Sequence, residues 1–569
     1  MKMNYIHIFS FFSLASAVSK NYCPLLGPVY PTPKSLGTDS AFHAAKQNIS
    51  STLDAVVAGN SSLLGSTYNT NTTSLSVQLW STNDSTPLFE YYYTSPLTRS
   101  SSIGVTDVDE DTVFRIGSAS KLLTVLLLLI EKGDVVLSDH VVKWVPELAD
   151  AAKQLRCNAT DRWDRIDHVQ WEELTLRDLA TQLSGISRDY GFGDLAASGV
   201  DLTAYGFPQP SEAPPCGGIL TGVCDRAQFF RGLLQEHPSF PISYTPSYSN
   251  ANFEILGFVL EAMTNTTYET LLHRDLVEPL GLKHLTYSAP ADKYGIIPWD
   301  AATSYWAVNT GAETPAGGLY ASTKDVTTLG RAILNNHLLS PAHTRRWMKP
   351  ATHTGSLDFS VGAPWEILSF PTSRVVDVYT KSGDLGSYSS MLGLLPDHSF
   401  GFTILAAGNS TSAVVQAVLL SMMETLVPAL DAAAKEEAAL RFTGIYTHNS
   451  TNSSIVITTD EGPGLNVEAW VNDSVDIIQS IGLLEGYTAA PSIRLYPTGL
   501  ENADQLSFVA IIQQLGSQPN GVPCTDWFVV DSTVYGNVGL DEFLFDLDSA
   551  GNAVAVSPRV MRTVLHKSF

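Results

Sequence analysis

Residues 114–130, FRIGSASKLLTVLLLLI, carry the strongest structural signal in the chain. The apolar run that follows Ser118 predicts a buried helix with this serine in its first turn. Because a step of three residues along a helix returns to nearly the same face, Lys121 can lie beside the Ser118 hydroxyl. A lysine can deprotonate a serine when burial or a nearby cation lowers the pKa of its amine. The stretch therefore predicts a Ser-x-x-Lys acyl-transfer nucleophile, and an ordinary helix-capping serine with a solvated lysine is the structural alternative.

Two later segments contain the side chains that such a nucleophile needs. Tyr248 and Asn250 lie just before a predicted helix, where a turn can point both into one cleft. A tyrosine between two lysines can have a depressed pKa and carry a proton, and an asparagine can hold an acyl amide or ester. Lys381, at the end of a predicted edge strand over 375–380, can supply positive charge. Taken singly, the three are better explained as a core tyrosine, a turn asparagine and a surface lysine.

Taken together, SASK at 118–121, YSN at 248–250 and KSG at 381–383 occur in the order of three known signatures. They are those of the serine β-lactamases and penicillin-binding proteins. Over roughly residues 70–430 the chain resembles the class C β-lactamase-like branch of that superfamily, and as a whole it resembles secreted fungal β-lactamase-like proteins. The resemblance implies an α+β fold, with an antiparallel sheet flanked by helices and an all-helical subdomain.

The resemblance also implies a role for each matched residue. Ser118 is the acylated nucleophile, Lys121 and Tyr248 are the general base pair, and Tyr248 delivers the proton to the leaving group. The backbone N–H groups of Ser118 and Asp384 form the oxyanion hole. The residues expected to bind substrate are Asn250, Lys381, Ser382, Gly383 and Asp384.

Two departures from the family pattern bear on the substrate. Asp384 places a carboxylate at the mouth of the oxyanion hole, where it disfavours a substrate carboxylate unless it points outward. Ser118 and Tyr248 are 130 positions apart, which is wider than expected, and the excess lies in a cysteine-bearing loop over 188–225. Both features favour a neutral ester or amide over a classical β-lactam.

Three functions remain open. The first is a serine hydrolase that acts on a small ester or amide through a Ser118 acyl-enzyme, with water as acceptor. The second is an acyltransferase or other tailoring enzyme of a secondary-metabolite pathway, with an alcohol or amine as acceptor. The third is a binding module on the same fold without catalysis, which the three intact signatures argue against.

The N-terminal residues and the sequons predict a secreted, extracellular glycoprotein. Lys2, the apolar run 6–14 and Ala15-Ser16-Ala17 are typical of a signal peptide cleaved after Ala17. No other segment approaches membrane-spanning length. Asn-x-Ser/Thr glycosylation candidates occur at Asn48, Asn60, Asn71, Asn83, Asn158, Asn265, Asn409, Asn449, Asn452 and Asn472.

The 5 cysteines suit an oxidising compartment, and Cys216 with Cys224 is the favoured disulfide. Their spacing matches no zinc pattern, so we expect no metal, and the motifs call for no cofactor. A formal net charge of −24 argues against nucleic acids and anionic membranes as partners. The oligomeric state stays open.

Length and composition predict more than one domain in this chain of 569 residues. After an Ala/Glu-rich joint near 430–441, short alternating strands replace helical periodicity. We therefore expect a signal peptide over 1–17, an N-terminal lead-in over 18–68, a catalytic domain over 69–430 and a C-terminal β-rich, possibly barrel-like domain over 431–569.

Overall fold

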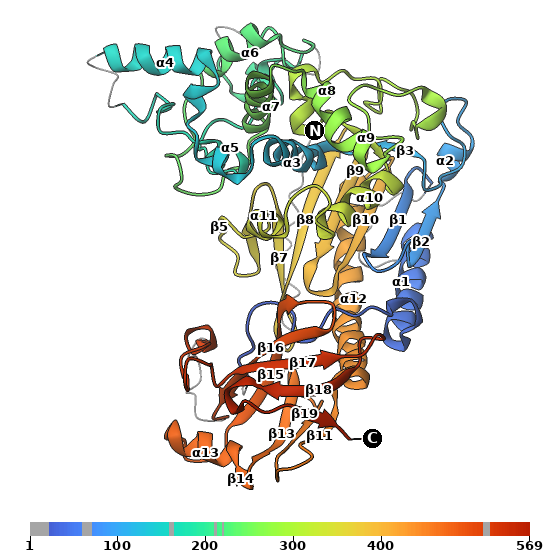
Figure 1. Cartoon of the computed structure of the whole chain (residues 1–569). Coiled ribbons are helices and arrows are strands. Elements are labelled where there is room, and N and C mark those ends of the chain that lie inside the picture. Colours follow the sequence, from blue (N-terminus) through green and yellow to red (C-terminus); the bar gives the residue numbers. More distant parts are fainter. Residues whose placement is uncertain are drawn as a thin grey trace.

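The computed structural model describes residues 22–59, 71–158, 164–197, 199–209, 213–218, 221–515 and 524–568. The predicted signal peptide and the sequon at Asn60 lie outside these residues. The described chain forms an eight-stranded sheet with a helical region above it, and a second β-structure below, joined by one long helix (Figure 1). This arrangement confirms the predicted fold class.

The upper sheet is antiparallel, in the order β2-β1-β10-β9-β8-β7-β6-β5. Every residue of β1, β9 and β10 is buried, because elements cover both faces of the sheet at its centre. The strands are β1 (Ser74–Ser81), β2 (Phe89–Tyr93), β5 (Thr352–His353), β6 (Phe359–Val361), β7 (Glu366–Pro371), β8 (Val375–Leu385), β9 (Tyr388–Leu395) and β10 (Phe400–Ala407).

Helices pack on both faces of this sheet. On one face α1 (Ser40–Val57) packs along α12 (Thr411–Phe442), and the Phe42 ring meets the Phe400 ring at 5.8 Å. On the other face α10 (Thr323–Leu334) packs against β1, β9 and β10. Gly330 permits this close approach, since a Cβ there would lie 2.5 Å from the Trp80 ring.

The helical region surrounds α3 and α7, whose residues are buried along most of their length. A two-stranded sheet of β3 and β4 connects it to the main sheet. Its elements are α2 (Pro96–Arg99), β3 (Val113–Arg115), α3 (Ser120–Lys132), α4 (Pro146–Cys157), α5 (Leu176–Ala180), α6 (Arg226–Leu233), α7 (Ala251–Thr264), α8 (Tyr268–Leu272), α9 (Glu278–Leu280) and β4 (Tyr320–Ser322). Helix α11 (Pro341–Trp347) lies instead beside β5 and β7 of the main sheet (Figure 1).

The C-terminal β-structure is a closed barrel. β12 pairs with both β11 and β13, so the sheet returns on itself, and β14 extends it beside β13. The rings of Phe442, Phe508 and Phe545 pack edge to face inside it, with centroids 5.0–5.4 Å apart. Its elements are β11 (Gly444–Thr447), β12 (Ser454–Thr458), β13 (Leu465–Asn472), β14 (Val475–Asp476), α13 (Ile477–Leu484), β15 (Ser492–Glu501), β16 (Gln505–Gln513), β17 (Glu542–Leu547), β18 (Ala553–Pro558) and β19 (Leu565–Lys567).

The long helix α12 bears on two expectations. It is continuous through the segment read as a joint, so the predicted boundary at 430/431 lies within a helix that runs from the sheet into the barrel. Among the described residues it is also the one helix long and apolar enough to cross a membrane, whereas the sequence pattern suggested none. Its apolar residues are instead buried against α1, β9, β10 and β12, as in the core helix of a globular protein.

The N-terminal lead-in is fastened to the barrel. A disulfide joins Cys23 to Cys524, a pairing that the sequence analysis did not single out. Nearby, Arg494 donates to the Tyr22 hydroxyl at 3.0 Å, and the Tyr30 hydroxyl donates to the Gly462 carbonyl at 3.3 Å. The two ends of the described chain therefore meet at one domain.

Candidate active site

The nucleophile candidate lies in a tight turn between β3 and α3. Ser118, predicted in the first turn of the helix, belongs to a 3₁₀ turn, Gly117–Ala119, and the α-helix begins two residues later at Ser120. Gly117 has φ +50°, and a Cβ there would lie 2.6 Å from the backbone nitrogen of Asp384. The turn is therefore pressed against β8, and only a glycine leaves room for that approach.

Two donors converge on the Ser118 hydroxyl. Lys121 Nζ donates to Ser118 Oγ at 3.0 Å, and the Tyr248 hydroxyl donates to the same oxygen at 2.7 Å. Tyr248 comes from the loop that precedes α7, so the structure brings together three side chains from two distant segments. Ser118 itself is half-buried.

Lys121 is fully buried and has three acceptors. Besides Ser118 it donates to Asn250 Oδ1 at 2.5 Å and to the Ala316 carbonyl at 2.6 Å. The carbonyl is offered by a π-helical turn, Thr314–Gly318, that packs against α3. Burial lowers the pKa of Lys121, because it disfavours the charged form.

Tyr248 lies among cations. Its ring centroid is 4.9 Å from Lys121 Nζ, 5.6 Å from Lys381 Nζ and 4.8 Å from the guanidinium carbon of Arg188. Burial opposes ionisation of the phenol, but the charges of Lys121 and Lys381 outweigh it and hold the pKa of Tyr248 below its usual range. Arg188 is a neighbour that the sequence analysis did not identify.

Lys381 and Ser382 lie inside a strand and not at the end of one. β8 continues to Leu385 and is an interior strand of the sheet, because the backbone pairing of Ser382 with Met391 carries the ladder past the predicted end. The β7 pairing, however, stops at Thr380, so β8 leaves one edge open beside Ser118 beyond that residue. The triplet therefore still reaches the candidate site.

The Glu366 carboxylate binds Lys381 and Ser382 of this triplet, and no sequence pattern predicted this contact. Lys381 Nζ donates to Glu366 Oε1 at 2.5 Å. The other carboxylate oxygen accepts from the Ser382 amide at 2.9 Å and from its hydroxyl at 2.7 Å. Burial lowers the pKa of Lys381, but Glu366 and Tyr248 outweigh it and raise the pKa above its usual range.

The backbone of the triplet lies against the nucleophile. A Cβ on Gly383 would lie 2.0 Å from the Ile116 carbonyl oxygen and 2.7 Å from the Ser118 nitrogen. The neighbouring Asp384 is exposed, and its carboxylate accepts from Ser389 Oγ of β9 at 2.5 Å. The carboxylate is thus tied to the adjacent strand.

A second carboxylate lies behind Asn250. The Asn250 side-chain amide donates to Asp189 Oδ1 at 2.7 Å, while its oxygen faces Lys121. The side chain of Asp189 is only 6% exposed, and burial raises its pKa to about 6. Sequence reasoning missed this residue, because it lies at the start of the Gly- and Pro-rich loop without a motif around it.

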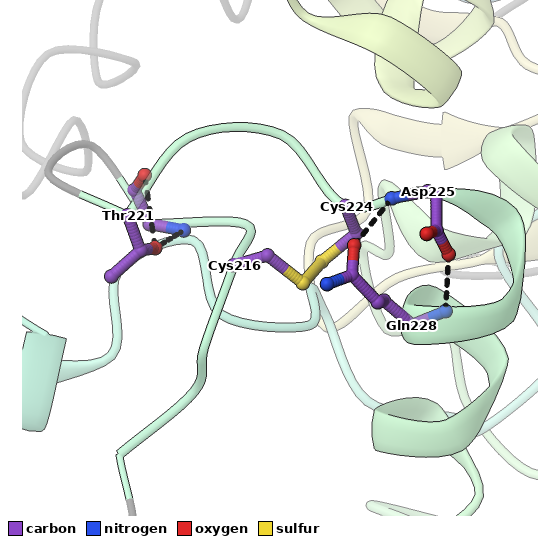
Figure 2. Close-up of a disulfide and its surroundings, with 6 residues drawn as sticks. Cys216, Thr221, Cys224, Asp225 and Gln228 are labelled. Atoms are coloured by element: carbon purple, nitrogen blue, oxygen red, sulfur yellow. Dashed lines mark hydrogen bonds between the residues drawn. A yellow bond between two sulfur atoms is a disulfide. The ribbon is translucent and has the colours of Figure 1, made fainter.

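The cysteine-bearing loop runs on from Asp189 and contains a disulfide just before α6 begins. Figure 2 shows the Cys216–Cys224 disulfide, with Asp225 and Gln228 forming a reciprocal capping box at the start of that helix. Cys157 is the free, exposed cysteine. The sequons that the structure describes are exposed at Asn48, Asn71, Asn83, Asn158, Asn265, Asn409, Asn449 and Asn452, and half-buried at Asn472.

The charged groups near Ser118 are therefore two lysines, an arginine and several carboxylates. Among the described residues, no group of three or more His, Cys, Asp or Glu side chains is arranged to hold a metal ion. A hydroxyl that accepts from an amine and a phenol, beside two backbone nitrogens, is suited to acyl transfer.

Comparisons with known proteins agree with this architecture. A family model described as Beta-lactamase matches residues 68–421, and one described as Beta-lactamase-like-like, C-terminal domain, matches residues 434–569. A Beta-lactamase-like protein of Arthroderma benhamiae is 28% identical over 95% of this chain and 95% of its own. Probable hydrolase M10 of Phoma sp. is 27% identical over 71% of this chain and 67% of its own.

Solved structures with similar folds were also found. The Beta-lactamase/D-alanine Carboxypeptidase from Yersinia pestis, complexed with citrate, is 17% identical, with a TM-score of 0.49. The match covers 68% of this chain and 99% of that chain.

Proposed function

This chain belongs to the β-lactamase family, and from that premise we propose that it is a serine hydrolase that cleaves a small neutral ester or amide through an acyl-enzyme on Ser118. The observation that carries the proposal is the pair of hydrogen bonds that Ser118 Oγ accepts from Lys121 and Tyr248. A hydroxyl placed between two groups of lowered pKa can lose its proton to either of them.

The proposed acylation begins when Ser118 Oγ attacks the substrate carbonyl carbon and its proton passes to the Lys121–Tyr248 pair. The negative charge on the carbonyl oxygen is stabilised by the backbone N–H groups of Ser118 and Asp384. Tyr248 then protonates the leaving alcohol or amine, and the acyl group remains on Ser118 as an ester. In the second half, water gives its proton to Tyr248 and attacks this ester, which releases the acid and restores the Ser118 hydroxyl.

The preference for a neutral substrate rests on two carboxylates. Glu366 already occupies the Lys381 ammonium and the Ser382 hydroxyl, which are the cationic and polar groups nearest to Gly383. Asp384 adds a second, exposed carboxylate one residue further along β8. A substrate that carries its own carboxylate at this edge would meet two like charges.

We propose as well that the protein is secreted. The two disulfides and the exposed sequons support an oxidising, glycosylating route. N-terminal sequencing of the protein secreted into the medium by a fungal expression host should begin at Val18. A mature chain that keeps residues 1–17 would contradict the signal peptide.

The nucleophile is tested by labelling with a fluorophosphonate reporter. The wild type should be labelled and should release nitrophenol from short-chain nitrophenyl esters faster than it opens a chromogenic cephalosporin. Ser118→Ala should lose labelling and ester turnover together. Ser120→Ala is the matched control, because this buried serine two residues away donates to the Gly117 carbonyl at 2.7 Å and not to the Ser118 oxygen. Labelling that persists in folded Ser118→Ala would overturn the assignment.

A further inference from the structure

The side-chain amide of Asn250 lies between two groups of opposite hydrogen-bonding character. On one side, Lys121 Nζ donates to its oxygen at 2.5 Å. On the other, its nitrogen donates to Asp189 Oδ1 at 2.7 Å. An ammonium can only donate and an ionised carboxylate can only accept, so the two neighbours permit one orientation of the amide.

Asp189 is well placed to impose that orientation. Its side chain is nearly buried, yet among the described residues its one hydrogen-bond donor is Asn250, and its ion pair with Arg188 is longer, at 3.4 Å. The contact therefore directs the carboxylate inward, to the acyl-transfer site. The charged or titratable groups that act on Asp189, or on which it acts, are Lys121, Arg188, Glu236, Glu254 and Glu313.

We propose that ionised Asp189 is a positioning residue for the acyl transfer: it holds the amide of Asn250 with its oxygen toward Lys121, and thereby keeps Lys121 Nζ on the Ser118 oxygen. This inference rests on the proposed function. If the carboxylate is protonated it can donate as well as accept, and the amide is free to turn its nitrogen toward Lys121. Two facing donors would then push Lys121 away from Ser118.

The pH dependence of labelling gives the first test. Burial raises the pKa of Asp189 to about 6, so the aligning charge is present above that pH and is lost below it. The rate of fluorophosphonate labelling in the wild type should fall as pH decreases through about 6. In Asp189→Asn the inflection near pH 6 should disappear, because an amide of the same shape does not titrate, while the limb set by the Lys121–Tyr248 pair should remain. An inflection near pH 6 that persists in Asp189→Asn would overturn the proposal.

A double-mutant cycle gives the second test. Asp189→Ala should slow labelling by roughly 10- to 100-fold while half-saturation by an ester substrate changes little. In an Asn250→Ala background the same substitution should change the rate by less than about 3-fold, since Asp189 then has no amide to hold. Equal effects in both backgrounds would show that Asp189 does not act through Asn250.

Glu236→Gln is the matched control. It removes a carboxylate whose charge also acts on Asp189, whereas the Asn250 amide is held by Lys121 and Asp189, so the substitution should keep the labelling rate within about 3-fold. Thermal unfolding of each variant separates slow labelling from misfolding. If Asp189 variants label normally while Ser118→Ala does not, the positioning role fails and the hydrolase proposal stands. Absence of labelling in the wild type would instead remove both.

Discussion

Tyr248 is the residue whose chemistry depends most on its surroundings. Burial of its hydroxyl opposes ionisation, and the ammonium groups of Lys121 and Lys381 favour it strongly enough to lower the pKa. Tyr248 therefore ionises at a lower pH than an ordinary tyrosine, and its phenolate is the form that can accept a proton. Glu366 pulls in the opposite direction, so the pKa reflects a balance of specific charges.

At this scale, Lys381→Met tests that balance. The substitution removes one of two cations that lower the pKa of Tyr248 and leaves Glu366 unneutralised, and both changes raise that pKa. The rising limb of the rate against pH should therefore move to higher pH, by about 1 unit or more. Ester hydrolysis measured across pH checks the shift.

The control for this prediction is Lys324→Met. Lys324 is 49% exposed and lies in an ion pair with Asp111, so its loss should leave the limb in place. If the rising part of the rate–pH curve stays at the same pH in folded Lys381→Met, the ionisation of Tyr248 does not determine that part of the curve.

At the scale of elements, the site depends on how β8 meets the turn before α3. Gly117 and Gly383 bring the two backbones together, and the β7 pairing ends at Thr380, beyond which the Glu366 side chain accepts from the Ser382 amide. The helix α3 then positions Lys121 one turn beyond the serine. These contacts are between main chains, which explains why small residues occur on both sides.

Gly383→Ala should disable the site without unfolding the sheet. A Cβ at this position would lie 2.0 Å from the Ile116 carbonyl oxygen, so β8 or the nucleophile turn must shift. We expect a loss of roughly 100-fold in labelling rate and about 1–3 kcal/mol of stability. Gly355→Ala is the control, because a Cβ there meets nothing within 4 Å. Normal labelling in Gly383→Ala would contradict the predicted contact.

At the scale of the whole molecule, the catalytic and barrel regions are connected twice. Helix α12 runs from the sheet into the barrel, and Phe442 at its end belongs to the barrel core (Figure 1). The N-terminal lead-in lies against the barrel before it reaches α1, and the Cys23–Cys524 disulfide attaches it there. The ring closed by this disulfide contains almost the entire chain.

Cys23→Ser should therefore destabilise the protein by about 2–4 kcal/mol, because the unfolded chain is no longer constrained across 501 positions. Urea unfolding under oxidising conditions measures the difference. Cys157→Ser is the control, since this cysteine is exposed and has no disulfide partner. Labelling of Ser118 should persist in both variants in the absence of denaturant. Equal stability of Cys23→Ser and the wild type would contradict a constraining role.

The local signatures made part of the site predictable. Ser118 and Lys121 are close because a helical step of three residues makes them so, and Tyr248 and Asn250 share one turn. The short alternating strands also indicated a β-rich C-terminal domain, and the structure closes it into a barrel through the pairing of β12 with β13. The extent of β8 was not predictable from its residues, since pairing with β9 extended the strand through the polar triplet. Continuity of α12 depended likewise on packing against the barrel.

Residue type and spacing along the chain were sufficient to predict the fold class and a site that contains Ser118, Lys121 and Tyr248, because those features arise from contacts within one turn or from recurrent motifs. Only the folded chain placed Asp189 behind Asn250, Glu366 on Lys381 and Cys23 beside Cys524. Each of these contacts joins segments whose separation in sequence carries no information about their distance in space. Their energies depend on burial, which a residue acquires only when the surrounding elements pack.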